Sequence, residues 1–278
     1  MNLYAKSDDY FTTKENVKKT LDIFGVAVIP NILNPQECED GEKGMWDYFG
    51  HISKDWEIPI EYKNPRSYRM FWKLFPMHSM LVQHWNAGHA QYVWDIRQNR
   101  NIINTFSEHI WGEKDEDMLV SFDAISLHLP PEITNRGYYR GRTWFHSDQS
   151  YLSDGLKCIQ GYVTLRDINE GDATLSVLEG SHNYQKDFRE RFNPDSKIDW
   201  YKLNEEEEEF YRNEKMCEEV RIKCPKGSLV LWDSRTIHCG VESLRNRPKE
   251  NFRSIVYVCY TPRSLSSEKL IKKKQKAF

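Results

Sequence analysis

The stretch WFHSDQ at residues 144–149 decides how this chain is interpreted. On an extended segment, residues i and i+2 point to the same face, so His146 and Asp148 present an imidazole and a carboxylate together. A second histidine, His238, follows far downstream in DSRTIHCG, residues 233–240, directly after the strand-like GSLVLW. Two histidines and one carboxylate form a facial triad that holds Fe(II) and leaves adjacent positions open. An H-x-D pair alone is weak evidence, so the surrounding segments carry the argument.

Short β-type segments separated by turn residues surround this motif from about residue 118 onward. They cover residues 118–129, 158–165, 174–178, 219–222, 228–232 and 253–260. Crossovers of helix length are mostly absent between them, which disfavours a doubly wound parallel sheet and favours an antiparallel sandwich or barrel. We therefore predict a mainly β fold with flanking helices.

The first third of the chain is predicted to be mostly helical. Thr12 and Glu15 have the spacing of a helix cap, and Gly25 supplies a stop signal. Asn34 and Pro35 open a second helix, because proline is favoured in the first helical turn. The predicted elements are a helix over 12–24, a strand over 26–29, a helix from 34 to about 49, an irregular aromatic-rich stretch over 53–94 and a helix over 101–111.

Composition excludes several classes of protein. The 278 residues are 39% hydrophobic and 29% charged, as in a globular chain. Lys+Arg 39 against Asp+Glu 42 gives a net charge of −3, without the basic excess of a general nucleic-acid binder. No apolar run approaches the roughly 20 residues that span a bilayer. We expect no nucleic-acid partner, no membrane association, a cytoplasmic location and reduced cysteines, since the six cysteines form no C-x-x-C pair.

Three further segments give the chain a family resemblance. They are GVAVIPNILNPQEC at 25–38, GDATLSVLEGSH at 171–182 and NFRSIVYVCYTP at 251–262. With the H-x-D motif and His238, they make the chain resemble the phytanoyl-CoA dioxygenase-like (PhyH) family of Fe(II)/2-oxoglutarate-dependent oxygenases. Ala173 departs from the family pattern, which has a glycine there. The resemblance implies a double-stranded β-helix core, a jelly roll of the cupin-like kind.

This resemblance implies one oxygenase domain over residues 1–278. Its parts would be a mostly helical region over 1–117, a jelly-roll core over 118–262 with an insertion at about 183–218, and a basic tail over 263–278. We expect the acidic run Glu205 to Glu209 to be a solvated helix face. We expect the lysine-rich run from Lys269 to Lys276 to be disordered.

The resemblance also assigns roles to residues. His146, Asp148 and His238 would be the iron ligands and the catalytic residues. Arg253 would bind the distal carboxylate of 2-oxoglutarate, because a guanidinium matches a carboxylate with a fixed bidentate fork. Arg253 follows His238 by 253 − 238 = 15 residues, somewhat farther than in the family pattern. Arg245 and Arg247 therefore remain alternatives.

Other polar residues are weaker candidates. Ser126 and His128 share one face of a predicted strand, and Gln160 opens a strand just after the metal motif. Each is a candidate for hydrogen bonding to the cosubstrate. A basic group among aromatic residues is a candidate for receiving an anionic part of a substrate, namely Arg66, Arg69 and Lys73.

The activity implied by the resemblance is that of a dioxygenase. It would hydroxylate a small molecule with O₂ and 2-oxoglutarate and release succinate and CO₂. Asp148 favours hydroxylation over halogenation, because related halogenases leave the carboxylate position empty. Two alternatives stay open: a zinc-dependent hydrolase on the same barrel, since two histidines and a carboxylate also suit zinc, and a non-catalytic jelly-roll interaction protein. The substrate and the oligomeric state are not predicted.

Overall fold

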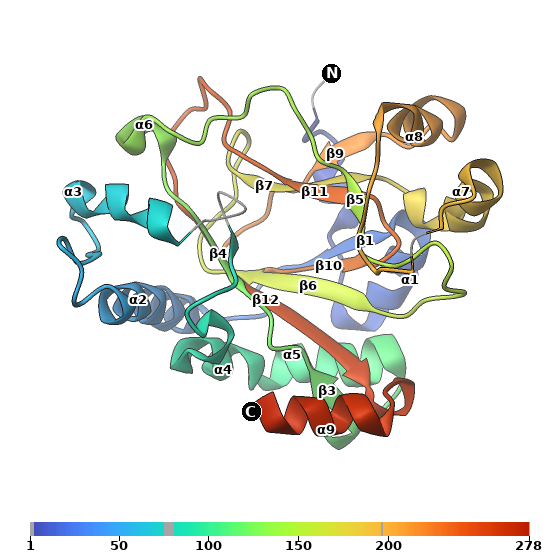
Figure 1. Ribbon diagram of the computed structural model, residues 1–278, viewed down its shortest axis with the longest axis horizontal. Helices are drawn as coiled ribbons and strands as arrows, with labels where there is room; N and C mark the ends of the chain where they lie inside the picture. Colours follow the sequence, from blue (N-terminus) through green and yellow to red (C-terminus); the bar gives the residue numbers. More distant parts are fainter. Residues whose placement is uncertain (1–2, 75–80, 196, 278) are drawn as a thin grey trace.

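Two antiparallel sheets lie one above the other at the centre of the molecule (Figure 1). The computed structural model describes residues 3–74, 81–195 and 197–277. In order, the larger sheet contains β1 (Val26–Ile29), β10 (Leu229–Asp233), β6 (Ile159–Thr164), β12 (Arg253–Pro262), β4 (Ile125–His128) and β2 (Leu81–Val82), and β3 (Met118–Val120) also pairs with β12. The smaller sheet contains β8 (Tyr201–Lys202), β5 (His146–Ser147), β11 (His238–Val241), β7 (Thr174–Leu178) and β9 (Glu219–Arg221).

From β4 onward the chain crosses repeatedly between the two sheets. Strands β4, β6, β10 and β12 lie in the larger sheet, and β5, β7, β9 and β11 lie in the smaller one. In each sheet, a strand from the end of the chain lies between two strands that come earlier in the sequence. In the larger sheet β12 lies between β4 and β6, and in the smaller sheet β11 lies between β5 and β7. This interleaving is that of a jelly roll. The predicted double-stranded β-helix core is thus confirmed.

Side-chain alternation explains why both faces of the larger sheet are buried. In β1, Val26 and Val28 face the smaller sheet and share a core cluster with Leu175 and Val177 of β7. Their neighbours Ala27 and Ile29 belong to a second cluster, which packs under the helices. The cluster that contains Val26 and Val28 fills only part of the space between the sheets. Polar side chains line the remaining part, which contains the H-x-D motif.

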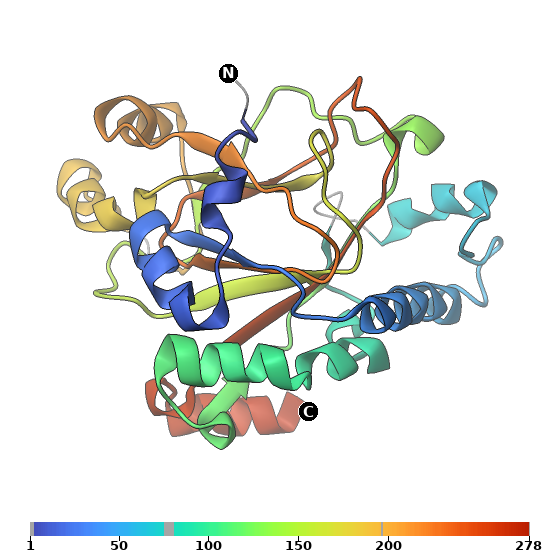
Figure 2. The same cartoon turned by 180° about the vertical axis from the view of Figure 1, so that it is seen from behind.

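Helices cover the outer face of the larger sheet and flank the ends of both sheets (Figures 1 and 2). They are α1 (Val17–Phe24), α2 (Pro35–Ile52), α3 (Pro65–Tyr68), α4 (Gln91–Arg97), α5 (Arg100–Asn104), α6 (Pro131–Thr134), α7 (Gln185–Phe192), α8 (Glu205–Glu209) and α9 (Glu268–Ala277). Helix α5 continues as a π-helix over Thr105–Trp111, and α8 continues as one over Phe210–Glu214. None of the helices in the described ranges has both the length and the apolar composition that a bilayer crossing requires.

Several predicted boundaries differ from the observed ones. Helix α2 begins as predicted, with a capping box between Asn34 and Glu37. The cap predicted at Thr12 is wrong, because the Thr12 amide donates to Val28 O instead and α1 begins only at Val17. The stretch 53–94 is less irregular than predicted, since it contains α3, β2 and the start of α4. Helix α4 escaped prediction because it is short and its N-cap residue, Ala90, offers no side-chain cap.

The strand predicted over 118–129 is interrupted by a bulge. Val120 pairs with Tyr260 and Ile125 pairs with Val256, so residues 121–124 face the shorter segment 257–259. An extra residue on one strand bends it and changes where side chains point. Here the bulged segment contributes Asp123 to the cavity described below.

Two expectations about charged runs are corrected. The segment from Lys269 to Lys276 is not disordered but lies in α9, where the ammonium of Lys274 lies 4.0 Å from the centre of the Phe122 ring. The run Glu205 to Glu209 forms α8 as expected, but Glu207 is buried rather than solvated. Its carboxylate accepts hydrogen bonds from the backbone amide of Asn204 and from the hydroxyl of Tyr201. All six cysteines are free thiols, as predicted.

The close packing of α2 on α4 gives a test of the fold. A Cβ at Gly44 would lie 2.4 Å from Tyr92 Cβ, whereas a Cβ at Gly50 would meet Ile60 O at 3.5 Å. Gly44→Ala is expected to lower the free energy of unfolding by about 1–3 kcal/mol through overpacking. Gly50→Ala is expected to raise it by about 0.5–1 kcal/mol, because alanine favours the helix. Thermal and urea unfolding of both variants measures the difference, and equal stabilisation by both would contradict the packing described.

Candidate metal centre

Pairing between β5 and β11 brings the distant histidines together. His146 of β5 lies directly opposite His238 of β11, and His238 also lies opposite Val177 of β7. Asp148 follows just beyond β5, where its amide donates to Ser234 O at 3.1 Å. The turn after β10 therefore holds both the start of β11 and the carboxylate. Because residues directly opposite point to the same face of a sheet, both imidazoles project between the sheets.

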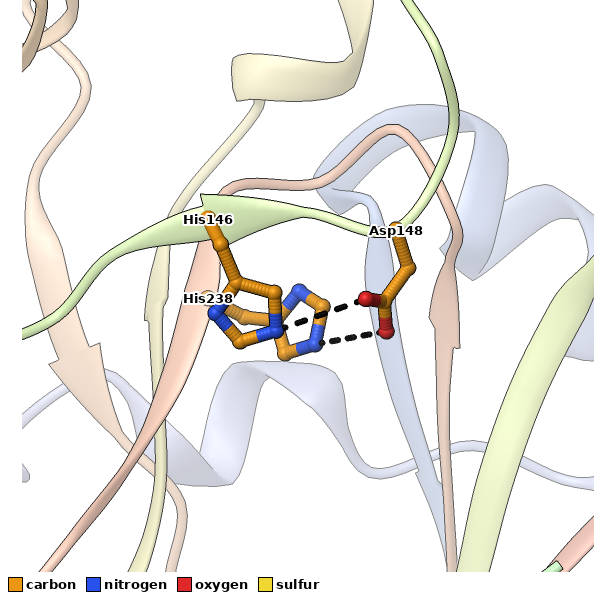
Figure 3. A group of neighbouring side chains, drawn as sticks. All are labelled: His146, Asp148 and His238. Atoms are coloured by element: carbon orange, nitrogen blue, oxygen red, sulfur yellow. Dashed lines mark ion pairs between the residues drawn. The ribbon is translucent and has the colours of Figure 1, made fainter. Parts of the chain in front are cut away.

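The three side chains converge on one point (Figure 3). His146 Nε2 lies 3.5 Å from Asp148 Oδ1, and His238 Nε2 lies 3.4 Å from Asp148 Oδ2. One ligand atom from each residue lies within 4.8 Å of the others. Both histidines are buried, at 5% and 4% exposure. The spacing suits a single ion bound by all three side chains.

The outer nitrogens of the histidines set which tautomer each ring adopts. His146 Nδ1 lies 3.3 Å from Trp144 O, and His238 Nδ1 lies 2.8 Å from Thr236 O. A carbonyl can only accept, so Nδ1 carries the proton and Nε2 keeps its lone pair. This is the arrangement of metal-binding histidines, whose other nitrogen donates to a carbonyl or carboxylate.

Asp148 is held as a carboxylate. Burial by itself would raise its pKa, but a hydrogen bond from His238 and the positive charges that His238 and His146 carry when protonated outweigh burial and hold the pKa well below the usual range. Gln160 contributes to this, because its Nε2 donates to Asp148 Oδ2 at 2.8 Å. Two imidazole nitrogens and one carboxylate that converge on one point form a donor set that favours a divalent cation.

The triad lines a cavity of about 780 Å³. Arg253, Ser126 and Gln160 line the same cavity, so the structure brings these sequence-predicted residues together with the triad. Arg253 is 4% exposed, and its Nη1 donates to Ser126 Oγ at 2.6 Å. Among the residues that the structure describes, its Nε has no hydrogen-bond partner, and neither has the hydroxyl of Tyr162, whose ring centre lies 5.4 Å from the guanidinium.

Unpartnered buried donors beside a cation-binding point fit a bound anion. A buried arginine costs free energy unless an anion or acceptors compensate it. Arg253 forms no ion pair with any described residue. The residues present therefore fit a metal ion together with a carboxylate-bearing small molecule.

The other predicted residues lie outside this cavity. Arg247 is buried by ion pairs with Glu132 and Asp172, both at 2.7 Å, and Arg245 stacks over the ring of Tyr138. His128 lies opposite Arg253 in the β4 and β12 pairing, but its ring nitrogens contact Gly137 O at 3.0 Å and Ser243 Oγ at 3.5 Å. Burial lowers the pKa of His128 to about 4, so its ring is neutral.

Several cavity residues were missed from the sequence. Trp200 lies 5.7 Å from the His146 ring, and Lys202 lies opposite His146 in the β5 and β8 pairing. Both belong to the predicted insertion, where a two-residue strand is too short for alternation to be recognised. Asp123 was hidden by the bulge, and burial raises its pKa. Trp144, which the sequence places beside the ligand, stacks on His146 at 4.6 Å.

Comparison with known proteins places the chain among relatives. The family model described as Phytanoyl-CoA dioxygenase (PhyH) matches residues 21–248. The chain is similar to Ava biosynthesis cluster protein O of Aspergillus versicolor, with 26% identity over 290 residues, which cover 96% of this chain and 85% of the relative.

Solved structures share the fold at low identity. AviO1 from Streptomyces viridochromogenes Tue57 has a TM-score of 0.59 at 14% identity, over 92% of this chain and 97% of AviO1. SnoK, a non-heme alpha-ketoglutarate-dependent carbocyclase from nogalamycin biosynthesis, has a TM-score of 0.56 at 15% identity, over 90% and 85% of the two chains. The epimerase SnoN, solved with Fe³⁺ and alpha-ketoglutarate, has a TM-score of 0.54 at 12% identity, over 90% and 83%.

The family match covers most of the chain and contains all three residues of the triad. The jelly roll and the donor set agree with it, and the expectation of iron and 2-oxoglutarate is confirmed at the level of the family. The chain belongs to the phytanoyl-CoA dioxygenase (PhyH) family of non-heme iron- and 2-oxoglutarate-dependent enzymes.

Proposed function

We propose that this protein is a dioxygenase that hydroxylates a small molecule and converts 2-oxoglutarate to succinate and CO₂. His146, Asp148 and His238 would hold Fe(II) through the two Nε2 atoms and the carboxylate, which converge on one point. When bound there, iron and 2-oxoglutarate would supply the O₂-dependent oxidation of a C–H bond. The side chains of this protein fix the ion, bind the cosubstrate and limit the access of water.

Arg253 carries the proposal. Its guanidinium is buried in the cavity of the triad, with Nε unpartnered and with Ser126 as a neighbouring hydroxyl. The distal carboxylate of 2-oxoglutarate is an anion that matches this donor in charge and geometry. A zinc-dependent hydrolase needs an activated water but no second anion site at this depth. The arginine therefore favours the oxygenase over that alternative.

The remaining cavity residues have supporting roles. Gln160 orients Asp148 through its hydrogen bond. The rings of Trp144 and Trp200 pack against the ring of His146 and limit the access of water to it. Lys202 and Asp123 line the same cavity and are candidates for contacts with the substrate. The retained Asp148 favours hydroxylation, because it occupies the coordination position that a halide would otherwise need.

Removal of the carboxylate ligand tests the activity. Asp148→Ala is expected to reduce iron-dependent formation of succinate by at least about 100-fold, because one of three metal ligands is lost. Asp154→Ala is the matched control, since the Asp154 side chain is 88% exposed and its carboxylate pairs with Arg189, which is not part of the triad. Succinate release from 2-oxoglutarate in air, with circular dichroism to verify the fold, measures the effect. Unchanged succinate release by Asp148→Ala would refute the triad.

Substitution of Arg253 is expected to weaken cosubstrate binding, whereas substitution of Arg247 is expected to lower stability. Arg253→Gln should raise the dissociation constant of 2-oxoglutarate by about 10–100-fold, the effect of losing a charge-assisted contact. Arg247→Gln should leave that constant nearly unchanged but lower the free energy of unfolding by about 3–5 kcal/mol, because Glu132 and Asp172 lose their partner. Anaerobic calorimetry and urea unfolding provide both values. The reverse pattern would assign cosubstrate binding to Arg247.

Gln160 is expected to act through Asp148. Gln160→Leu should weaken binding of Mn(II), used as a redox-stable substitute for Fe(II), by about 10–100-fold. The exposed Gln98→Leu serves as the control for the loss of an amide. Electron paramagnetic resonance titration reports the free Mn(II). Equal affinity in both variants would show that the hydrogen bond to Asp148 does not tune the metal site.

A further inference from the structure

A second cavity is lined by residues from the end of β4, from α3 and from α6. Figure 1 shows where these three elements lie. The volume of this cavity is about 890 Å³, and it shares no lining residue with the cavity of the triad. We call it the arginine cavity and define it by its lining residues Ile58, Pro65, Arg66, Tyr68, Arg69, Phe71, Trp72, His128, Leu129, Ile133, Thr134, Arg136 and Gly137. The mechanism proposed above uses none of these residues.

The charged residues that line the arginine cavity are all cations. Arg66, Arg69 and Arg136 line it, and no carboxylate of the described part of the chain does. None of the three forms an ion pair or a side-chain hydrogen bond with any described residue, in contrast to Arg247 with its two carboxylates. The residues 75–80, FPMHSM, carry no acidic side chain either. In a chain of net charge −3, this is a local concentration of positive charge without an internal counter-charge.

The rest of the lining is largely apolar. Tyr68 and Phe71 are buried, and Leu129 and Ile133 form part of the wall opposite α3. Trp72 lies on the cavity with 64% of its surface exposed. An exposed tryptophan beside guanidinium groups provides an aromatic face next to anion donors. Concave apolar walls with a few charged groups are typical of small-molecule sites.

His128 separates the arginine cavity from the metal centre. It lies opposite Arg253 across the β4 and β12 pairing and lines the arginine cavity, while Ser126, two residues earlier, lines the other one. Both ring nitrogens of His128 contact protein oxygens, Gly137 O and Ser243 Oγ, which fixes the ring as a wall. A ligand in the arginine cavity therefore does not reach the triad through this side chain.

We propose that the arginine cavity is a second binding site, which takes an organic anion with an apolar or aromatic body, such as a phosphate monoester of a hydrocarbon chain. The anion would contact the three arginines, and the body would lie against Phe71, Trp72 and Ile133. This site goes beyond the proposed dioxygenase activity, and it needs neither iron nor 2-oxoglutarate to be occupied.

Calorimetric titration with n-octyl phosphate tests the site in the full chain without added metal. We expect binding that weakens at least about tenfold in Arg66→Gln and in Arg136→Gln, because each loses a charge-assisted contact. Arg140→Gln, an exposed arginine outside the cavity, should bind as the wild type does. Trp72→Ala should also weaken binding, whereas n-octanol and inorganic phosphate should each bind far more weakly than n-octyl phosphate. The arginine variants should unfold at the wild-type temperature, since these side chains have no partner to lose.

Three results would overturn the proposal. One is the absence of n-octyl phosphate binding at millimolar concentration, and another is equal affinity in Arg66→Gln, Arg136→Gln and the wild type. The third is displacement of n-octyl phosphate by 2-oxoglutarate, which would assign the anion to Arg253. Because the titration involves no turnover, its failure is distinguishable from a failure of the dioxygenase assignment, which the succinate assay measures separately.

Discussion

The pairing of His146 with His238 across β5 and β11 is the contact on which the candidate site depends. Strand β5 is only two residues long, so its position comes from its neighbours: β11 on one side, β8 on the other, and the hydrogen bond from the Asp148 amide to Ser234 O. A shift of β5 by one residue in this pairing would turn His146 away from the space between the sheets, whereas His238 would stay in place through the pairing of β11 with β7. The jelly roll thus serves to bring two sequence-distant segments into register at a single point.

The barrel interior combines buried charges of opposite sign without pairing them to each other. Asp148 is stabilised by the two histidines and Gln160, whereas Arg253 has a hydroxyl neighbour and an unpartnered Nε. Buried ionised groups persist in proteins when ligands or hydrogen bonds compensate them. A metal ion at the triad would compensate the charge of Asp148, and a dicarboxylate that binds this metal and reaches Arg253 would compensate the charge of the guanidinium. The need to compensate both buried charges thus links the metal to the cosubstrate.

The sequence predicts the parts of the structure that depend on local pattern. The alternation of His146 and Asp148, the helix start at Asn34 and Pro35 and the β-type segments are each visible within a few residues. Features that depend on tertiary contacts were not predictable. The Gln160 side chain binds Asp148 only because β6 lies beside the H-x-D turn, and Trp200 and Lys202 reach the cavity only because β8 pairs with β5. Likewise, the lysine-rich run predicts disorder, because the contact of Lys274 in α9 with the distant Phe122 cannot be recognised from the local sequence.

The central claim is that the triad and Arg253 together bind Fe(II) and 2-oxoglutarate. The most direct measurement is an anaerobic titration of the metal-free protein with Fe(II) and then 2-oxoglutarate, followed by visible absorption. Chelation of Fe(II) by the cosubstrate gives a weak metal-to-ligand charge-transfer band. The account predicts that this band appears in the wild type and is absent in His146→Ala. Binding of Fe(II) without the band, at saturating 2-oxoglutarate, would contradict it.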